Sequence, residues 1–257
     1  MNLIPGVILT LLLYYVTLFV VAQVIHNNSI VDIAWGAGFV LMAWVSFLLG
    51  DNNPVGTLIV VLITIWGLRL SWHIGKRNIG RPEDPRYVAM REGWGDRFPL
   101  LKAFGQVFLL QGFLMFLIGS PVLLTHRFWA PRLTLLSWLG LAVWIGGFLF
   151  ESVGDAQLRA FLRKPENRGH IIQSGLWRYT RHPNYFGEST MWWGIFLIAL
   201  TSVPLWMAVV SPVVITWLLV FVSGVPLTEK SFEGNEEFAA YARVTSRFFP
   251  WFPRKGN

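Results

Sequence analysis

Long apolar runs separated by short polar stretches dominate the sequence. Seven runs approach or exceed the roughly 20 mostly apolar residues that a helix needs to cross a bilayer. They cover 3–25, 31–49, 56–75, 101–125, 133–153, 185–206 and 208–227. The first run lacks a basic flank and a small-residue cleavage site, so we expect a span of the mature protein and not a signal peptide. The pattern predicts an all-α integral membrane protein with seven transmembrane helices.

The basic residues predict the orientation of these spans, because Lys and Arg concentrate in cytoplasmic loops. Of the 21 Lys and Arg residues, 18 fall after the third run, after the fifth run or after the seventh. Arg127 and Arg132 fall on the opposite side, and Arg69 lies within the third run. We therefore predict that the N-terminus is outside and the C-terminus is cytoplasmic.

Composition narrows the class further. Charged residues make up 14% of the chain and hydrophobic residues 54%, whereas soluble domains average about 25% charged. The net charge is +7, but the basic residues lie between apolar runs that are long enough to span a membrane. We therefore expect contact with membrane lipids and no binding of nucleic acid. The absence of cysteine excludes disulfides and thiolate chemistry. No repeat or linker divides the chain, which predicts one domain over residues 1–257.

Four ionisable residues lie in or at the edge of the apolar runs: Asp32, Arg69, Glu151 and Glu188. A charge there costs at least about 2.5 kcal/mol, so it usually faces a partner or a polar cavity. Asp32 and Arg69 could form a structural ion pair. Glu151 could instead reach the interface with its side chain.

Asp32 has two further interpretations. On a helix it shares a face with Trp35 and Gly36, which would join a carboxyl group to an aromatic wall and to a gap left by glycine. That combination is typical of a pocket. Alternatively, Asn28 or Ser29 caps the helix, and Asp32 is a first-turn acid favoured by the helix dipole.

The stretch after the fifth run carries Asp155, Arg159 and Arg163 at a spacing of four residues, on one helical face. One interpretation is an interfacial helix whose arginines meet anionic lipid headgroups. The other is a phosphate site, because arginine binds phosphate through two parallel hydrogen bonds.

Polar residues are densest between 175 and 188, before the sixth run. Pro183 fits the first turn of a helix, which would place Asn184 and Glu188 one turn apart on one face. His182 is either a packed loop residue or a catalytic one. No metal-ligand spacing, glycine-rich nucleotide loop or Gly-x-Ser-x-Gly motif is present. Any bound nicotinamide cofactor would therefore be held by side chains of the loops.

These stretches resemble the membrane steroid 5-alpha-reductase family, and more closely its bacterial homologues, from the second span to the seventh. The resemblance rests on these motifs: Asn27-x-Ser29-x2-Asp32-x2-Trp35-Gly36, Asn78-x2-Arg81-Pro82, Glu83-Asp84-Pro85-Arg86-Tyr87, Asp155-x3-Arg159-x3-Arg163-Lys164-Pro165, Arg181-His182-Pro183-Asn184-Tyr185-Phe186-Gly187-Glu188 and Thr245-x2-Phe248-Phe249-Pro250-Trp251. An Arg-His-Pro-x-Tyr motif also occurs in isoprenylcysteine carboxyl methyltransferases. The alternative is therefore a membrane methyltransferase that uses S-adenosylmethionine.

The resemblance implies an oxidoreductase of steroid or lipid metabolism. Such an enzyme takes NADPH from the cytoplasm and reduces the Δ4 carbon–carbon double bond of a 3-oxo-Δ4 steroid, or of a similar apolar enone from the bilayer, by hydride transfer. It also implies a monomer in the bacterial inner membrane, with a cofactor-binding half at about 133–257. Arginines in two loops favour NADPH, which carries three phosphate groups, over S-adenosylmethionine, which carries none. A transporter would need a polar path across the membrane, and the intramembrane charges are too few to form one.

Site residues follow from the resemblance and from their chemistry. The cofactor-binding residues implied by the motifs are Asn78, Arg81, Asp155, Arg163, Asn184 and Glu188. Position and chemistry add Arg86, Arg159, His170, Arg178, Tyr179, Arg181, His182, Lys230 and Tyr241. The catalytic candidates are Asp32, Glu188 and Tyr87, the substrate-binding candidates are Asp32, Trp35 and Trp66, and no metal is implied.

Hydride attack on an enone builds negative charge on its oxygen, so a hydrogen-bond donor must stand there. We expect Asp32, kept protonated by the low dielectric, to be that donor. Animal members of the family carry a Gln-Glu pair in the second span and a tyrosine in the third. This chain has Asp32 and Trp66-Gly67 in the comparable regions.

Overall fold

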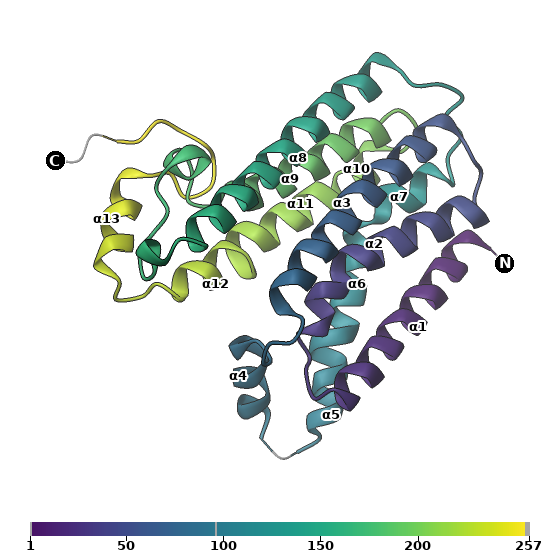
Figure 1. The fold of residues 1–257 in the computed structure, drawn as a ribbon. Coiled ribbons are helices and arrows are strands. Elements are labelled where there is room, and N and C mark those ends of the chain that lie inside the picture. The colour runs from purple at the N-terminus through teal and green to yellow at the C-terminus, as the bar shows by residue number, and fades with distance from the viewer. Residues whose placement is uncertain (1, 96, 255–257) are drawn as a thin grey trace. The chain divides into compact units, whose positions relative to one another are not determined.

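The computed structural model describes residues 2–95 and 97–254, and in these residues helices joined by short loops make up the fold, without a strand (Figure 1). The chain divides into two compact units. Unit 1 comprises Met1–Thr134 and Ala199–Val210, and unit 2 comprises Leu135–Ile198 and Ser211–Asn257. Unit 2 thus begins close to residue 133, where the cofactor-binding half was expected to start. That half and the single domain stay predictions.

Unit 1 is built around the antiparallel helices α1, α2 and α3. Its helices are α1 (Leu3–Val24), α2 (Ile30–Leu49), α3 (Pro54–Asn78), α4 (Pro85–Trp94), α5 (Pro99–Ala103), η1 (Phe104–Leu109), α6 (Leu110–Ile118), α7 (Ser120–Thr125) and α10 (Leu205–Ala208). Helices α3 and α4 both begin with a proline after a side-chain cap. Asn53 accepts a hydrogen bond from the Gly56 amide at 2.9 Å, and Asp84 accepts one from the Arg86 amide at 2.9 Å.

Helices α2 and α3 approach each other closely at two glycines. A Cβ atom on Gly36 would collide with the Gly67 carbonyl oxygen, and one on Gly67 would lie 2.5 Å from the Gly36 oxygen. Just beyond, the Ala37 amide donates to Ser71 Oγ at 2.9 Å. The expectation that Gly36 leaves a gap for a pocket is therefore wrong, because the backbone of α3 fills that space.

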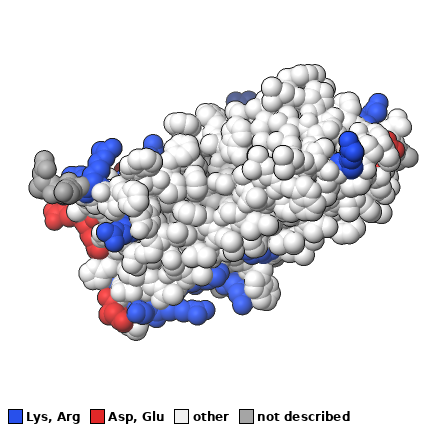
Figure 2. Space-filling view, turned by 90° about the horizontal axis from the view of Figure 1, so that it is seen from above, with Lys and Arg blue, Asp and Glu red and all other residues white. Residues whose placement is uncertain are grey.

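Six helical segments of the described residues are long and apolar enough to cross a membrane: Leu3–Val24, Ile30–Leu49, Pro54–Asn78, Pro99–Ile118, Leu135–Leu162 and Leu205–Lys230. They match six of the predicted runs and support a membrane protein. The run predicted at 185–206 instead folds as α9 (Pro183–Ala199), which has 17 residues and is followed by a turn before α10. Most of the face in Figure 2 carries no charged side chain, as expected for helices that face lipid.

Unit 2 is organised by two long helices, α8 and α9. Its helices are α8 (Leu135–Leu162), η2 (Pro165–Asn167), η3 (Gly175–Arg178), α9, α11 (Val210–Trp217), η4 (Leu218–Val222), α12 (Val225–Lys230) and α13 (Glu236–Val244). The first residue of α11, Val210, belongs to unit 1. Gly175, the first residue of η3, has a φ of +63°, which favours glycine. A Cβ atom at this position would also collide with Gln157.

Glycines spaced seven residues apart on α8 let α9 pack against it. A Cβ on Gly140 would lie 2.7 Å from the Gly194 oxygen, and one on Gly147 would lie 2.6 Å from the Gly187 oxygen. At the end of the row, a Cβ on Gly154 would meet the ring of Pro183 at 3.1 Å. Small residues in this spacing permit close packing of membrane helices. This row therefore fixes the position of the first turn of α9 in unit 2.

Two adjacent glycines of α8 test this packing. Gly147→Ala should cost about 1–3 kcal/mol, because the new methyl group meets backbone atoms of α9 that cannot rotate away. Gly146→Ala is the matched control, since nothing lies within 4 Å of its Cβ position, and it should be neutral or stabilising. Thermal unfolding of the two variants in detergent measures the difference. Equal melting temperatures would contradict the close packing.

Candidate functional site

A carboxylate, a guanidinium and a phenol meet at the start of α2 in unit 1. The Tyr87 hydroxyl donates to Asp32 Oδ1 at 2.6 Å, and Arg86 Nη2 donates to Asp32 Oδ2 at 2.9 Å. Arg86 also forms an ion pair with Asp84, and Gln111 Nε2 lies 3.4 Å from the Tyr87 oxygen. We call Asp32, Arg86 and Tyr87 the acid–phenol cluster. It joins two of the predicted catalytic residues, Asp32 and Tyr87, with Arg86, which was predicted to bind the cofactor.

The cluster gives Asp32 two hydrogen-bond partners. Arg86 donates to one carboxylate oxygen and Tyr87 to the other, and the donor role expected of Asp32 stays a prediction. The ion pair lies with Arg86 and not with Arg69, which had been considered as its partner. Asp32 does lie in the first turn of α2, as one interpretation required. The Ser29 side chain makes no cap there.

Tyr87 has the properties of a hydrogen-bond donor. Its side chain is buried, and burial together with the neighbouring Asp32 carboxylate raises the pKa of the phenol well above its ordinary value of 10.0. The hydroxyl therefore keeps its proton at every physiological pH. Its hydrogen points at a carboxylate oxygen whose other oxygen is held by Arg86.

The segment before α4 is tied to the loop between α1 and α2. Glu83 Oε1 accepts a hydrogen bond from the Asn28 amide at 2.7 Å, and the Asp84 amide donates to Ser29 Oγ at 2.7 Å. The Glu83 side chain is only 7% exposed and forms an ion pair with Arg91. These bonds hold α4 over the first turn of α2, which brings Tyr87 to Asp32. Sequence reasoning gave Glu83 no role.

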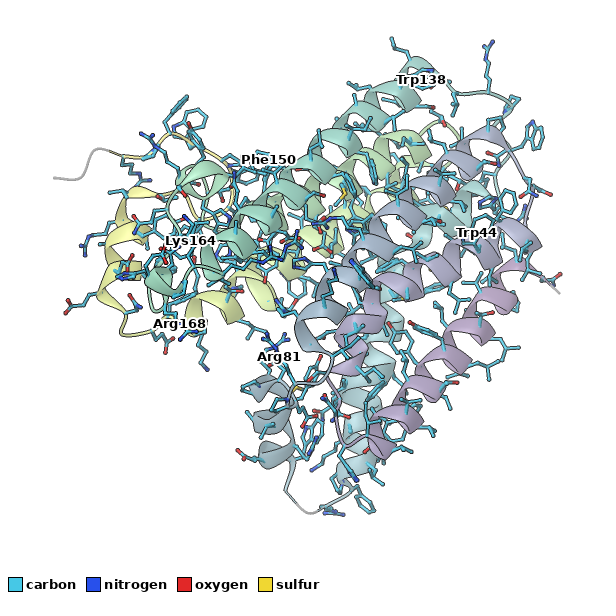
Figure 3. The ribbon with its side chains drawn as sticks, in the orientation of Figure 1. Trp44, Arg81, Trp138, Phe150, Lys164 and Arg168 are labelled. Atoms are coloured by element: carbon cyan, nitrogen blue, oxygen red, sulfur yellow. The ribbon has the colours of Figure 1, made fainter. Side chains whose placement is uncertain are left out.

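A cavity of about 510 Å³ lies between the α1–α2 loop and the segment after α3. Asn78 and Arg81 line it, together with Ser29, Glu83 and Asp84, and Figure 3 labels Arg81. The two cofactor-binding residues expected in the first basic loop thus face the same cavity. Its polar groups lie beside apolar side chains that include Ile25, Ile30 and Ile33, so the lining fits a ligand with both polar and apolar parts.

The expected substrate-binding aromatics lie in a row inside unit 1. The ring centroid of Trp35 is 5.1 Å from that of Phe39, which is 5.5 Å from that of Trp66. Trp35 is partly exposed, whereas Trp66 is 1% exposed. Trp66 thus packs in the core, and substrate contact by either tryptophan stays a prediction.

Unit 2 holds a second charged cluster, centred on Glu229 of α12. Arg181 Nη2 and His182 Nε2 each lie 3.1 Å from Glu229 Oε1, and Arg247 Nε lies 3.5 Å from Oε2. We call these four residues the Glu229 cluster. It connects the turn before α9 with α12 and with the C-terminal segment. The sequence gave no signal for Glu229 beyond its position beside Lys230 at the end of the last apolar run.

A cavity of about 780 Å³ opens on the Glu229 cluster. Arg181, Lys230 and Arg247 supply three cations to its lining, against the carboxylates of Glu229, Glu233 and Glu236. The buried Nε of Arg181 has no hydrogen-bond partner in the part of the chain that the structure describes. A buried donor without a partner is costly, so Arg181 is suited to bind an additional acceptor.

Asn184, in the first turn of α9, also has a buried polar atom without a partner in the described part of the chain. Its Oδ1 atom is buried and finds no donor among residues 2–95 and 97–254. Glu188 follows one turn later on α9 and is half-buried, as the helical spacing predicted. The Oδ1 atom of Asn184 is therefore an acceptor that a ligand amide could satisfy.

The C-terminal segment and α13 hold the turn that precedes α9. The Arg181 amide donates to the Ser246 carbonyl at 2.9 Å, and Thr180 Oγ1 donates to the Phe248 carbonyl at 2.8 Å. Tyr241 donates its hydroxyl to the Trp177 carbonyl and is buried, which raises the pKa of the phenol. Tyr241 supports the turn in this arrangement, and its expected contact with a cofactor stays a prediction.

The remaining candidates of unit 2 lie on or after α8 and around η3. Asp155 is buried, and His170 lies 3.1 Å from Glu237. The others are exposed or half-buried: Arg159, Arg163, Arg178, Tyr179 and Lys230. No group of three His, Asp or Glu side chains within the described residues is arranged to hold a metal ion.

His182 gives a pH-dependent prediction. Burial lowers the pKa of its imidazole below the ordinary 6.5, against the effect of Glu229, and the charges of Arg181 and Arg247 add to the lowering. The unfolded chain then binds the proton more readily, so this contribution to stability is complete above pH 6.5 and is lost as the pH falls below it. The loss approaches about 1.4 kcal/mol per pH unit at most.

His182→Gln should therefore flatten the fall in melting temperature between about pH 6.5 and pH 5. Thermal unfolding of His182→Gln and of the unsubstituted protein across this pH range measures the two slopes. An unchanged slope in His182→Gln would show that His182 is not buried in its neutral form.

Comparisons with known proteins find a family model and a relative that match this chain. The chain is 26% identical to an uncharacterized protein of Schizosaccharomyces pombe, over 79% of this chain and 66% of that protein. It therefore spans slightly less than two thirds of that relative. No solved structure matches the chain. The family model described as "Protein of unknown function (DUF1295)" matches residues 18–245. The chain belongs to the DUF1295 family.

Proposed function

We propose that this chain is an oxidoreductase that uses NADPH to reduce the carbon–carbon double bond of an apolar enone. A 3-oxo-Δ4 steroid is the proposed substrate class. The hydrogen bond between Tyr87 and Asp32 in the acid–phenol cluster carries the proposal. It provides a buried proton donor at the edge of a membrane-spanning helix, which is where a lipid-soluble carbonyl compound needs one. The motif resemblance to steroid 5-alpha-reductases supports the same activity.

The acid–phenol cluster supplies the electrophilic part of the reaction. Negative charge develops on the carbonyl oxygen as the β-carbon receives hydride, and a preorganised donor stabilises that charge. In our proposal the carbonyl oxygen takes the place of Asp32 Oδ1 as acceptor of the Tyr87 hydrogen bond. Arg86 keeps Asp32 in place and offsets its charge, so that the carboxylate does not repel the developing enolate.

Tyr87 would also replace a tyrosine that this sequence lacks in its third span. The family's animal members carry a tyrosine in the third span, whereas Trp66 and Gly67 occupy the comparable region here. In this proposal α4, which follows that span, provides the phenol instead, and Asp32 provides the acid of the second span. The donor role expected of Asp32 thus passes to its partner.

The residues of unit 2 fit NADPH, which supplies a hydride when it is bound. The unpartnered Oδ1 of Asn184 can accept from the carboxamide of a nicotinamide ring, and Glu188 lies one turn away. Arg181, Lys230 and Arg247 line a cavity and can bind phosphate oxygens. The exposed Arg159, Arg163 and Arg178 add cations on the same unit, at the end of α8 and in η3.

We further propose the setting expected from the sequence. The protein would cross a bacterial inner membrane seven times as a monomer, with its N-terminus outside and its C-terminus in the cytoplasm. Six apolar helices support six of these spans, and α9, with 17 residues, would be the remaining one. The charged clusters would then face the cytoplasm, where NADPH is found, and the enone would enter from the bilayer.

Tyr87→Phe tests the donor. Loss of one preorganised donor to a developing oxyanion lowers turnover by about 100- to 1,000-fold. NADPH affinity should stay unchanged, because the phenol acts on the enone. Tyr15→Phe is the control in the same unit, since the Tyr15 hydroxyl donates to the sulfur of Met115. Oxidation of NADPH with an enone steroid measures turnover, and full activity in Tyr87→Phe would eliminate this role.

Asn184→Leu tests the cofactor site by separating stability from binding. The substitution removes an acceptor that is buried without a donor, so the melting temperature of the ligand-free protein should stay the same or rise. NADPH affinity should fall by about 5- to 10-fold, the loss of one hydrogen bond. If the substitution unfolds the protein, or if the variant binds NADPH normally, Asn184 is a structural residue.

A further inference from the structure

Three large aromatic side chains near the C-terminus are exposed. Phe249, Trp251 and Phe252 are 69%, 74% and 75% exposed, and we call these residues the aromatic tail. They lie in a segment without helix, after α13. A cluster of exposed aromatic rings on a loop is costly in water and usually marks a binding surface.

The backbone of the aromatic tail is nevertheless fixed. The Trp251 amide donates to the Tyr179 carbonyl at 2.9 Å, and the Arg254 amide donates to the Val244 carbonyl at 2.9 Å. The ring of Phe252 lies 5.9 Å from that of Tyr179. The rings are thus presented outward from an ordered segment, which lowers the entropy cost of binding a surface.

Aromatic contacts connect the tail with a membrane-spanning helix of the same unit. The ring of Phe249 lies 6.1 Å from that of Phe186, in the first turn of α9. Phe186 in turn lies 5.3 Å from Phe150 of α8 (Figure 3), and α8 is one of the six apolar segments. The row of rings therefore leads from the side of a spanning helix to the tail. Aromatic side chains gather in this way where a span leaves the hydrocarbon.

Basic residues flank the aromatic tail on both sides. Arg247 precedes it with 46% of its side chain exposed, and Arg254 follows it and is exposed. No acidic residue lies in the stretch 247–254. Cations beside aromatic rings match the boundary of a membrane with anionic headgroups.

We propose that the aromatic tail inserts into the headgroup region of the membrane, with Arg254 beside anionic lipids. The occupant of this surface is the lipid boundary and not a second protein. Since Trp251 of the tail bonds to the backbone of residue 179, lipid contact also anchors the segment that leads into the turn before α9. This inference does not depend on the proposed reductase activity.

Site-directed spin labelling tests the proposal, because the chain contains no cysteine. Cysteines are introduced singly at Trp251 and Phe252 and labelled with a nitroxide in vesicles of neutral and anionic phospholipid. Leu149→Cys on the exposed side of α8 is the lipid reference, and the exposed Glu166→Cys is the water reference. Collision rates with oxygen and with a water-soluble nickel complex are compared at the four positions.

Labels at 251 and 252 should fall between the two references, with more oxygen collisions and fewer nickel collisions than the label at 166. Frequent nickel collisions, as at 166, would place the tail in water and overturn the proposal. Infrequent collisions with both reagents would mean that a protein surface covers the tail, which also overturns it.

Adding Arg254→Gln to the Phe252→Cys variant tests the charge. The equilibrium for insertion should fall by about fivefold in vesicles with anionic lipid and should not change in neutral vesicles. An equal effect in both kinds of vesicle would contradict the role of the anionic headgroup.

Discussion

The absence of water inside a bilayer is the constraint on which this structure depends. Backbone groups there must bond within a helix, so the apolar runs fold into helices and polar chemistry is confined to helix ends and loops. In each unit a carboxylate then joins segments that are distant in sequence. Glu83 ties the approach to α4 to the α1–α2 loop, and Glu229 ties α12 to the turn before α9 and to the C-terminal segment. The two candidate sites are built on these connections.

Close helix packing provides the rigid frame for both sites. Gly36 and Gly67 bring α2 against α3 in unit 1, and the glycine row of α8 brings α9 close in unit 2. Without hydrophobic attraction between helices in lipid, such packing supplies much of the association energy. The first turn of α2, which carries Asp32, and the first turn of α9, which carries Asn184, are thus each fixed by a glycine contact on the same helix. Preorganised groups of this kind need little rearrangement when a ligand binds.

Hydropathy predicted the helices well, because the length and composition of each apolar run determine a span without reference to the rest of the chain. The spacing of Asn184 and Glu188 was also predictable from the helical period. The partner of Asp32 was not, because Arg86 and Tyr87 reach it only through the bonds made by Glu83 and Asp84. Gly36 was misjudged for the same reason, since its neighbour is the backbone of another helix. The end of α9 at Ala199 was missed because the apolar run continues beyond the helix.

We propose that this chain binds NADPH as its cofactor. Titration of the purified protein in lipid nanodiscs with NADPH, NADH and S-adenosylmethionine tests it most directly. We predict that NADPH binds, and that NADH binds about 10- to 100-fold more weakly because it lacks the phosphate that charge-assisted bonds to arginine would hold. Binding of S-adenosylmethionine without binding of NADPH would contradict the account and favour a methyltransferase.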